Sequence, residues 1–569
     1  MTAAQVPPPH PVDHAKDFIE LCRRAAQEFL QTIVVVDDRA TYGRPDVVTT
    51  LDSPDYEPVR DIDEFESEFS DHDLGSGSSL DVSALTDASA DIGLTCAVLR
   101  PEFKEQHDGT LDRRLTNVAK RADVLVLDWQ LNDETRGEAA LRLLQEVAAD
   151  DDRQPARLRL VCIYTSDPNL NGVYEAVRGL LGSSLSKCSD PTGNEWWLSC
   201  GYLRVVILSK AGSSVPSHTG PSTIVSESEL PRRLLAEFTY LTAGLVSNVA
   251  VAALAAVRQD AHRLLTRFPI ELDPAFLSHR FFEGGPESED LLVRLVADEI
   301  KSVLDGADIR RWVSASAVRL WGEDHVPQQK DFHVKGRRTM SRGDLLEILE
   351  KDSHDDKVMI DNSSKSGDQF DLKKLISPSI TKVLTQDEAR AREMDYDFSR
   401  LTCLSRNDAF PFPAERTPTL TEGTIIRGRV GDKGIYLLCA MPLCDTVRIR
   451  RDARAFPFVP LELASAEGRY NLVARSPEGE RLYLAFSSKN HYDIVRHNFS
   501  GDATGVVRAK RSKTPKGDRF VFVDASSKPW IWIGELRFAH AHRKLNEMGA
   551  ASSRVGLDES HVLRIASGS

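Results

Sequence analysis

The 569-residue chain contains only eight cysteines, and no two of them form a CxxC pair. They are scattered at Cys22, Cys96, Cys162, Cys188, Cys200, Cys403, Cys439 and Cys444. A chain of this length can bury several hydrophobic cores and does not need disulfide bonds for stability. We therefore expect reduced thiols, as in a cytoplasmic protein, and about three folding units.

The chain also lacks an excess of basic residues, with 72 Lys and Arg against 86 Asp and Glu, a formal net charge of -14. This balance argues against a chain-wide nucleic-acid footprint and against bulk affinity for acidic lipid. The N-terminus has no charged-then-apolar signal architecture, so we expect the protein to stay in the cytoplasm. Residues 238–257 carry no charge over a length that could span a membrane. Their Thr, Ser, Asn and many Ala residues favour a buried helix instead.

Two short apolar runs end abruptly in carboxylates. Residues 122–127 have the length and Val/Leu content of a strand buried on both faces, and Asp128 follows directly. Residues 32–36 form a β-branched run that stops at Asp37 and Asp38. Open α/β sheets place their chemistry at the carboxyl ends of parallel strands, so these ends mark a candidate site.

Three more apolar runs, with helical segments between the strands, continue this pattern. They cover residues 94–99, 158–164 and 203–208, and the last two end at Thr165 and at Ser209-Lys210. Alternation of this kind predicts an α/β, doubly wound, parallel five-stranded sheet of flavodoxin-like type. Large insertions interrupt it: an irregular acidic and Ser-rich segment at about 39–91, and a second at 172–200.

The sequence divides into four predicted parts. A helix lies in residues 1–31, the sheet domain occupies 32–226, a mainly helical region covers 227–404, and a β-rich domain covers 405–569. The predicted helices of the third part span residues 229–268, 288–304, 309–320, 342–351 and 381–404. Regularly spaced short strands in the last part predict a small antiparallel β barrel or sandwich. These strands are expected at 424–430, 435–439, 446–449, 470–474, 482–486, 504–508, 520–523 and 530–533, before a final helix at 535–549.

The residues that close the strands suggest one chemistry. We call Asp37, Asp38, Asp128, Thr165 and Lys210 the strand-end residues. Three carboxylates at one sheet edge repel one another unless a divalent cation and an ammonium group neutralise them, and Mg²⁺ suits such oxygen ligands. A phosphoryl group on Asp128 would then be stabilised by the metal, a hydroxyl and Lys210, which is most of what phosphoryl transfer requires.

Residues 33 to about 215 resemble a response-regulator receiver domain, whose pattern the strand-end residues match position by position. The resemblance implies that Asp128 is phosphorylated, that Thr165 and Lys210 assist, and that Asp37, Asp38 and Asp128 hold Mg²⁺ with the backbone carbonyl of Gln130. Two further expectations come from the same resemblance. Gly137 matches the glycine usual after the acceptor, and the side chains of Gln130 and Asp167 would flank the attacking water.

Some positions depart from the receiver pattern. The aromatic residue usual three positions before the lysine is Ile207, and the proline usual after the lysine is Ala211. The insertion after Arg39 is expected to replace the first helix, a main docking surface for kinases in receivers. The resemblance implies a histidine kinase or phosphotransfer protein as donor and an effector protein as a further candidate partner, and it leaves a homodimer open.

The chain also resembles the divergent receiver family of bacterial anti-phage phosphorelays. In such systems some receivers are fused to toxic effectors and others drain stray phosphate. The chain shows no nucleosidase, nuclease or protease signature, which favours a phosphate buffer or regulator. A receiver phosphorylates itself and is not a turnover enzyme.

Two other classes compete with this interpretation. A haloacid-dehalogenase-type phosphatase would need an Asp two residues after the nucleophile, but this chain has Gln130 there. That family also needs an acidic pair late in the chain, whereas here the acidic pair comes first. A receiver-regulated effector or nucleic-acid-binding protein would act through the C-terminal β domain. Its candidate contact is the basic stretch 508–519, although charged hairpin tips are usually just solvated, so nucleic acid is not the favoured partner.

Overall fold

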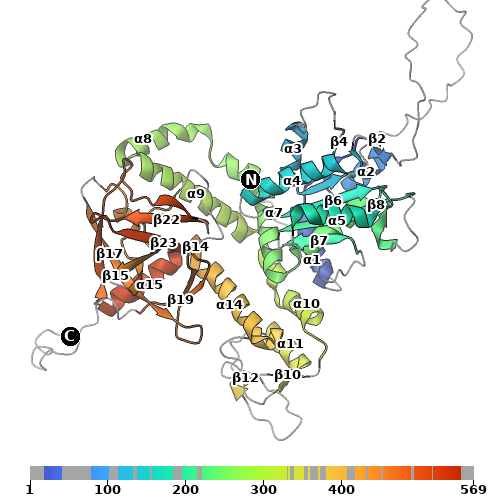
Figure 1. The fold of residues 1–569 in the computed structure, drawn as a ribbon. Helices are drawn as coiled ribbons and strands as arrows, with labels where there is room; N and C mark the ends of the chain where they lie inside the picture. The colour runs from blue at the N-terminus through green and yellow to red at the C-terminus, as the bar shows by residue number, and fades with distance from the viewer. Residues whose placement is uncertain are drawn as a thin grey trace, which may run out of the picture. The chain divides into compact units, whose positions relative to one another are not determined.

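The structure is a computed structural model that divides the chain into two compact units (Figure 1). The first comprises residues 1–328 and 343–352, and the second comprises 329–342 and 353–569. The description covers residues 18–41, 79–101, 113–131, 137–153, 157–182, 195–200, 202–213, 221–329, 331–333, 339–351, 357–358, 370–371, 380–406, 417–430, 433–449, 453–487, 493–514 and 517–552. Most of the predicted insertion at 39–91 and residues 183–194 of the one at 172–200 lie outside these residues.

The first unit is built on a seven-stranded sheet. Its order is β4 (Thr95–Leu99), β1 (Thr32–Val36), β5 (Val124–Leu127), β6 (Arg159–Thr165), β8 (Leu203–Lys210) and β7 (Trp197–Cys200), with β9 (Ile224–Val225) beside β8. The five predicted strands are present and parallel. The prediction of a five-stranded sheet was incomplete, because β7 adds an antiparallel edge and β9 a short parallel one.

Helices cover both faces of this sheet (Figure 1). One face packs against α1 (Phe18–Phe29), α2 (Val82–Asp91) and α6 (Leu230–Thr242), and the other against α3 (Arg113–Ala119), α4 (Glu138–Arg153) and α5 (Leu170–Leu181). Side chains alternate between the two cores along each strand, because successive residues of a strand point to opposite faces of the sheet. The expectation that the insertion replaces the first crossover helix was wrong: α2 fills that place, capped by the Asp81 carboxylate, which accepts a hydrogen bond from the Ala84 N–H at 3.0 Å.

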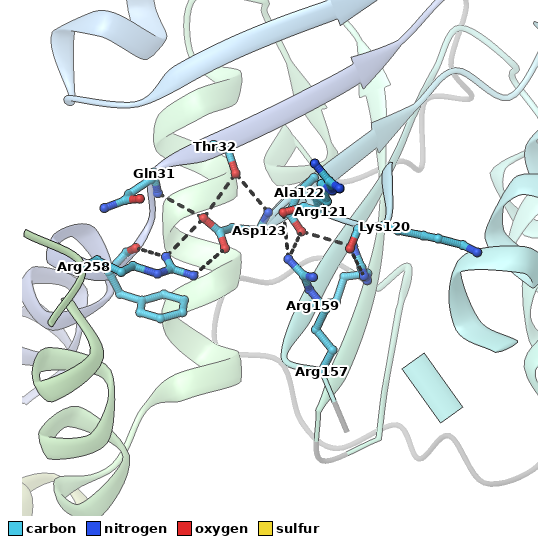
Figure 2. Close-up of polar contacts among 10 residues, drawn as sticks. Gln31, Thr32, Lys120, Arg121, Ala122, Asp123, Arg157, Arg159 and Arg258 are labelled. Atoms are coloured by element: carbon cyan, nitrogen blue, oxygen red, sulfur yellow. Dashed lines mark hydrogen bonds and ion pairs between the residues drawn. The ribbon is translucent and has the colours of Figure 1, made fainter. Parts of the chain in front are cut away.

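Polar contacts fix the helices at the amino-terminal edge of the sheet (Figure 2). Asp123, just before β5, accepts hydrogen bonds from the Gln31 N–H and the Thr32 hydroxyl. Arg258 of α7 (Leu245–Thr266) donates to the Phe29 carbonyl at 2.9 Å and lies 3.3 Å from Asp123 Oδ1. These contacts join α1, α7 and the sheet at the edge opposite Asp128.

The helical part of the first unit differs from the prediction in three respects: the helix predicted at 229–268 is two helices, the one predicted at 309–320 is a 3-10 turn followed by a helix, and no helix was predicted at 273–283. A single helix over 229–268 was wrong, because α6 ends at an extended Ala243 and α7 begins after Gly244. The remaining helices are α8 (Asp273–Glu283), α9 (Gly285–Gly306), α10 (Ala315–His325) and α11 (Arg342–Glu350), with short 3-10 turns η2 (Pro221–Thr223), η3 (Ile270–Leu272) and η4 (Ile309–Val313). In the described residues, every helix is too short or too polar to cross a membrane.

The second unit contains a ten-stranded antiparallel sheet. Its order is β18 (Leu472–Arg475), β19 (Arg481–Ala485), β17 (Arg454–Ala464), β16 (Lys433–Cys439), β15 (Thr424–Val430), β23 (Pro529–Leu536), β22 (Gly517–Val523) and β21 (Lys510–Thr514), with β20 (Val495–Phe499) beside β17 and β14 (Leu404–Arg406) beside β23. The helical elements of this unit are α13 (Thr381–Thr385), α14 (Glu388–Cys403), η5 (Leu443–Asp445) and α15 (Phe538–Ser552). Two short strand pairs are β10 (Asp331–His333) with β11 (Thr339–Ser341), and β12 (Lys357–Val358) with β13 (Phe370–Asp371). A third pair, β2 (Ala40–Thr41) with β3 (Leu80–Asp81), belongs to the first unit.

The antiparallel character of this region was predicted, but not every strand. The segments predicted as strands at 446–449 and 504–508 are bends and turns, apart from an isolated bridge between Arg508 and Thr419, and the long strand β17 was missed. β17 contains Pro457 and Pro460, and proline in an apolar run argues against a strand when only the sequence is considered.

Candidate phosphoryl-acceptor site

Backbone pairing brings the ends of β1 and β5 together. Val36 is in register with Leu127, so the residues that follow them, Asp37 and Asp128, emerge side by side. The Asp128 N–H donates to the Val36 carbonyl at 2.9 Å, and the Asp37 N–H donates to the Leu99 carbonyl at 3.1 Å. The two carboxylates are therefore placed by sheet hydrogen bonds and not by a mobile loop.

Three carboxylates meet at this edge. Oxygen atoms of Asp37, Asp38 and Asp128 all lie within 4.8 Å of one another. Asp37 and Asp128 are buried and Asp38 is half-buried. The Arg39 N–H donates to Asp37 Oδ1 at 2.8 Å, which fixes the turn that carries the acidic pair.

Lys210 supplies the positive charge inside this cluster. Its Nζ lies 2.7 Å from Asp37 Oδ2 and 3.5 Å from Asp128 Oδ1, and its side chain is fully buried. Burial would lower the pKa of Lys210, but the charges of Asp128 and Asp37 outweigh it, so that pKa is raised above its ordinary value. Lys210 is therefore an ammonium ion at neutral pH.

Asp128 is a buried carboxylate whose charge is only partly compensated. Burial raises the pKa of Asp128 to about 6; Lys210 opposes this shift, and the charges of Asp37 and Asp38 add to it. Asp128 Oδ1 is buried without a hydrogen-bond partner in the described residues, and Lys210 is 3.5 Å away. A second cation would relieve this imbalance, and an all-oxygen donor set fits a hard divalent ion such as Mg²⁺.

The structure places Gln130 half-buried in the bend after Asp128, on the chain segment that leaves the site. Its role as a carbonyl ligand and as a neighbour of the attacking water stays a prediction. Asp167 stands at the corresponding position after β6, where its N–H donates to Thr165 Oγ1 at 3.0 Å and its Oδ1 accepts from the Asn169 N–H.

Thr165 ends β6 fully buried, in register with Ser209 of β8. The sequence placed Ser209 at the end of the predicted strand, directly before Lys210, but we did not include it among the strand-end residues. Its hydroxyl is also buried and has no hydrogen-bond partner in the part of the chain that the structure describes. Two hydroxyl-bearing residues thus close neighbouring strands at this edge.

Gly137 has a steric role beneath the site. Its φ is +66°, and a Cβ at this position would lie 2.4 Å from the ring of Trp129, the residue that follows Asp128. Only glycine combines that backbone conformation with such a close approach. The glycine expected from the receiver pattern therefore lets Trp129 bury its ring in the core.

The positions that depart from the receiver pattern have their own contacts. Ile207 is buried in the core that α4 and α5 cover. The Ala211 N–H, which a proline would lack, donates to the Val225 carbonyl at 3.2 Å. That carbonyl also accepts the Tyr164 hydroxyl at 2.8 Å, and the Lys210 Nζ lies 5.7 Å from the Tyr164 ring centre. Strand β9 is therefore connected to both strands that carry Thr165 and Lys210.

Comparison with known proteins agrees with this geometry. Residues 29–215 match the family model described as a response receiver domain. The N-terminal part of the chain therefore carries a receiver domain. No curated protein and no solved structure matches the chain. A receiver is a signalling domain and generally not a turnover enzyme, and receivers typically bind Mg²⁺ at an acidic cluster like the one formed here.

The basic stretch at 508–519 is part of the second unit and forms an edge. Its residues occupy the edge strand β21 and the neighbouring β22. Arg508 is 2.8 Å from Asp502 and Arg519 is 2.9 Å from Glu478, so carboxylates of the chain neutralise part of the charge. Lysines on an edge strand are also a common protection against pairing with another chain.

Proposed function

We propose that the receiver domain accepts a phosphoryl group on the Asp128 carboxylate, from a phosphohistidine of a histidine kinase or phosphotransfer protein. The observation that carries this proposal is the placement of Lys210 between Asp37 and Asp128, within a cluster of three carboxylates. Few groups besides such charges are needed, because phosphoryl transfer depends mainly on positioning and electrostatic stabilisation.

In the proposed reaction an Asp128 oxygen attacks phosphorus while the P–N bond to the donor histidine breaks, and the imidazole leaves and takes up a proton. Asp37, Asp38 and Asp128, with the Gln130 carbonyl, would hold Mg²⁺, which when bound neutralises charge on the phosphoryl oxygens. Lys210 would donate to one phosphoryl oxygen and the Thr165 hydroxyl to another. Gln130 and Asp167 would then govern the access of water to the aspartyl phosphate.

The consequence of phosphorylation in this proposal is a change in protein contacts. Lys210 must shift part of its interaction from Asp37 to the new phosphoryl group, and β9 lies directly beside it. The resemblance to receivers of anti-phage phosphorelays supports a role as a phosphate buffer or regulator in such a system, in the cytoplasm. Strand β9 leads into α6, which offers a route from the site to a partner surface.

An alternative proposal is a receiver-regulated effector that acts on nucleic acid through the C-terminal β domain. The exposed Lys510 and Lys513 on β21 are the observation in its favour. Its test is salt-dependent retention on DNA and RNA, compared between the wild type and a variant in which Lys510, Arg511, Lys513 and Lys516 are neutralised. Equal retention of the two proteins would end this alternative.

The test of the main proposal is incubation with acetyl phosphate, or with a phosphorylated kinase, in the presence of Mg²⁺. Wild type should incorporate phosphate and bind beryllofluoride, and Asp128→Asn should do neither. Asp87→Asn is the matched control, because Asp87 is an exposed carboxylate on α2 and should leave both signals unchanged. Incorporation that persists in Asp128→Asn would refute Asp128 as the acceptor.

A further inference from the structure

Exposed apolar side chains are concentrated in one part of the first unit. Among the described residues 22 large apolar side chains are exposed, and 11 of them lie between Val246 and Val296. Phe281 and Phe282 are the most open, at 82% and 78% exposed. Such a concentration is unusual for an ordinary surface and marks an interaction site.

Helix α8 carries the centre of this surface. None of its residues is buried, and it packs mainly against η3 and α9. Figure 1 shows α8 beside α9. Leu277 and Phe281 are four residues apart and so share one helix face. A helix of 11 residues is unstable alone in water and is normally stabilised by burying one apolar stripe. Because no residue of α8 is buried, its apolar side chains lack a packing partner.

The α8 and α9 helices are held as a defined hairpin. They join at Gly284, whose φ is +100°, and Arg280 forms an ion pair with Glu289 at 2.6 Å across the corner. Arg267, just after α7, pairs with Glu299 of α9 at 3.0 Å. Helix α9 is thus held to the end of α7 by an ion pair, and both helices of the hairpin carry exposed apolar side chains.

We define the α8–α9 apolar surface by the exposed side chains of η3, α8 and α9. They are Ile270, Leu272, Leu277, Phe281, Phe282, Val293, Leu295 and Val296. At ~100 Å² for an aliphatic and ~200 Å² for an aromatic side chain, their exposed fractions amount to roughly 650 Å² per copy. Two copies would bury roughly 1,300 Å², within the range of a specific protein interface.

The charge of the helices around the α8–α9 apolar surface argues against two other binding partners. Residues 245–306 contain six Lys and Arg against ten Asp and Glu, which disfavours an anionic membrane surface or a nucleic acid. A two-helix hairpin with exposed apolar side chains on both helices can form half of a four-helix arrangement, and a two-fold axis supplies the other half from the same surface. We propose that the α8–α9 apolar surface is the interface between two copies of this chain.

The test is the mass of the full chain in solution, measured by light scattering and sedimentation over a concentration series. Wild type should be a dimer, and Phe281→Ser with Phe282→Ser should raise the dimer dissociation constant at least tenfold while circular dichroism stays unchanged. Leu463→Ser is the matched control, since Leu463 is 63% exposed in the second unit and its replacement should leave the dimer intact.

A second variant checks the geometry independently. Phe282→Cys should form a disulfide-linked dimer on mild oxidation, whereas Leu463→Cys should not. A wild type that stays monomeric, or a dimer that survives the double serine variant, overturns the proposal. So does a monomer that binds phosphatidylcholine and phosphatidylglycerol vesicles through Phe281 and Phe282, because the occupant would then be a membrane.

Discussion

The Lys210 ammonium lies 2.7 Å from Asp37 and 3.5 Å from Asp128, so one buried cation serves two buried carboxylates. The shorter contact is to Asp37, which is expected to bind metal, and the longer one is to Asp128, which is expected to bind metal and to accept the phosphoryl group. Asp128 is consequently left with one buried oxygen that has no hydrogen-bond partner in the described residues. This imbalance is the physical basis of the site's expected response to metal, pH and phosphate.

Removing the cation should destabilise the receiver domain. Lys210→Met leaves three carboxylates together with no positive charge, and the loss of one partner of a buried pair costs about 3–5 kcal/mol. The free energy of unfolding, measured in urea without metal, should fall by this amount. Adding Mg²⁺ should restore part of the lost stability. Lys120→Met is the control, because Lys120 pairs with Asp150 at 3.2 Å near the surface and should cost below about 1 kcal/mol. A loss for Lys210→Met no larger than the control's would contradict the buried pairing.

Stability should depend on pH through Asp128. Its folded pKa of about 6 lies above its ordinary value of 3.8, so the folded state holds the proton more tightly than the unfolded state between these values. The contribution is fully present below pH ~4 and is lost as the pH rises through about 6, by about 1–3 kcal/mol. Urea unfolding in EDTA should therefore show the stability of wild type relative to Asp128→Asn falling over this range. A difference that is constant with pH would refute the shift.

Mg²⁺ binding should be visible through Trp129, whose ring is buried directly after Asp128. Titration with Mg²⁺ should change tryptophan emission in wild type, and Asp38→Asn should weaken the apparent affinity roughly tenfold or more, because it removes a charged oxygen ligand. Trp129→Phe identifies the reporter, since the chain has seven tryptophans. An emission change of equal size and midpoint in Asp38→Asn would exclude Asp38 as a ligand.

Gly137→Ala should be strongly destabilising, by about 2–4 kcal/mol, since it combines a left-handed backbone with overlap on the Trp129 ring. Gly93 is a matched control: its φ is +79°, but an added Cβ would meet nothing within 4 Å. Gly93→Ala should lower the free energy of unfolding by only about 1 kcal/mol, because it adds backbone strain without steric overlap. Thermal unfolding of both variants measures the difference, and equal losses would show that contact with Trp129 is unimportant.

Ser209→Ala should leave the receiver as stable as wild type or stabilise it by about 0.5–1 kcal/mol, because it removes a buried hydroxyl without a partner in the described residues. Ser476→Ala is the contrasting case, since the Ser476 Oγ accepts from the N–H groups of Glu478 and Glu480. That variant should lose about 1 kcal/mol. A marked loss in Ser209→Ala, seen by urea unfolding, would show that a water or another group already satisfies the hydroxyl.

The sequence by itself determined the receiver strands and the identity of the strand-end residues. Apolar runs of strand length are a local signal, and parallel strands bring their carboxyl ends to one sheet edge, so Asp37, Asp128 and Lys210 could be grouped without coordinates. The same local signals failed where tertiary packing decides. The strand β17 with its two prolines and the added strand β9 both depend on distant partners.

Only the tertiary structure decided the properties of the site and of the surface. Which carboxylate Lys210 approaches most closely, how far burial raises the pKa of Asp128, and why Gly137 must be glycine depend on distances between residues far apart in the chain. The exposed face of α8 is a similar case: apolar residues of this kind are usually buried, and only the fold shows that no described residue of the first unit covers them. Sequence pattern reports what a side chain prefers, whereas burial and charge balance are properties of its surroundings.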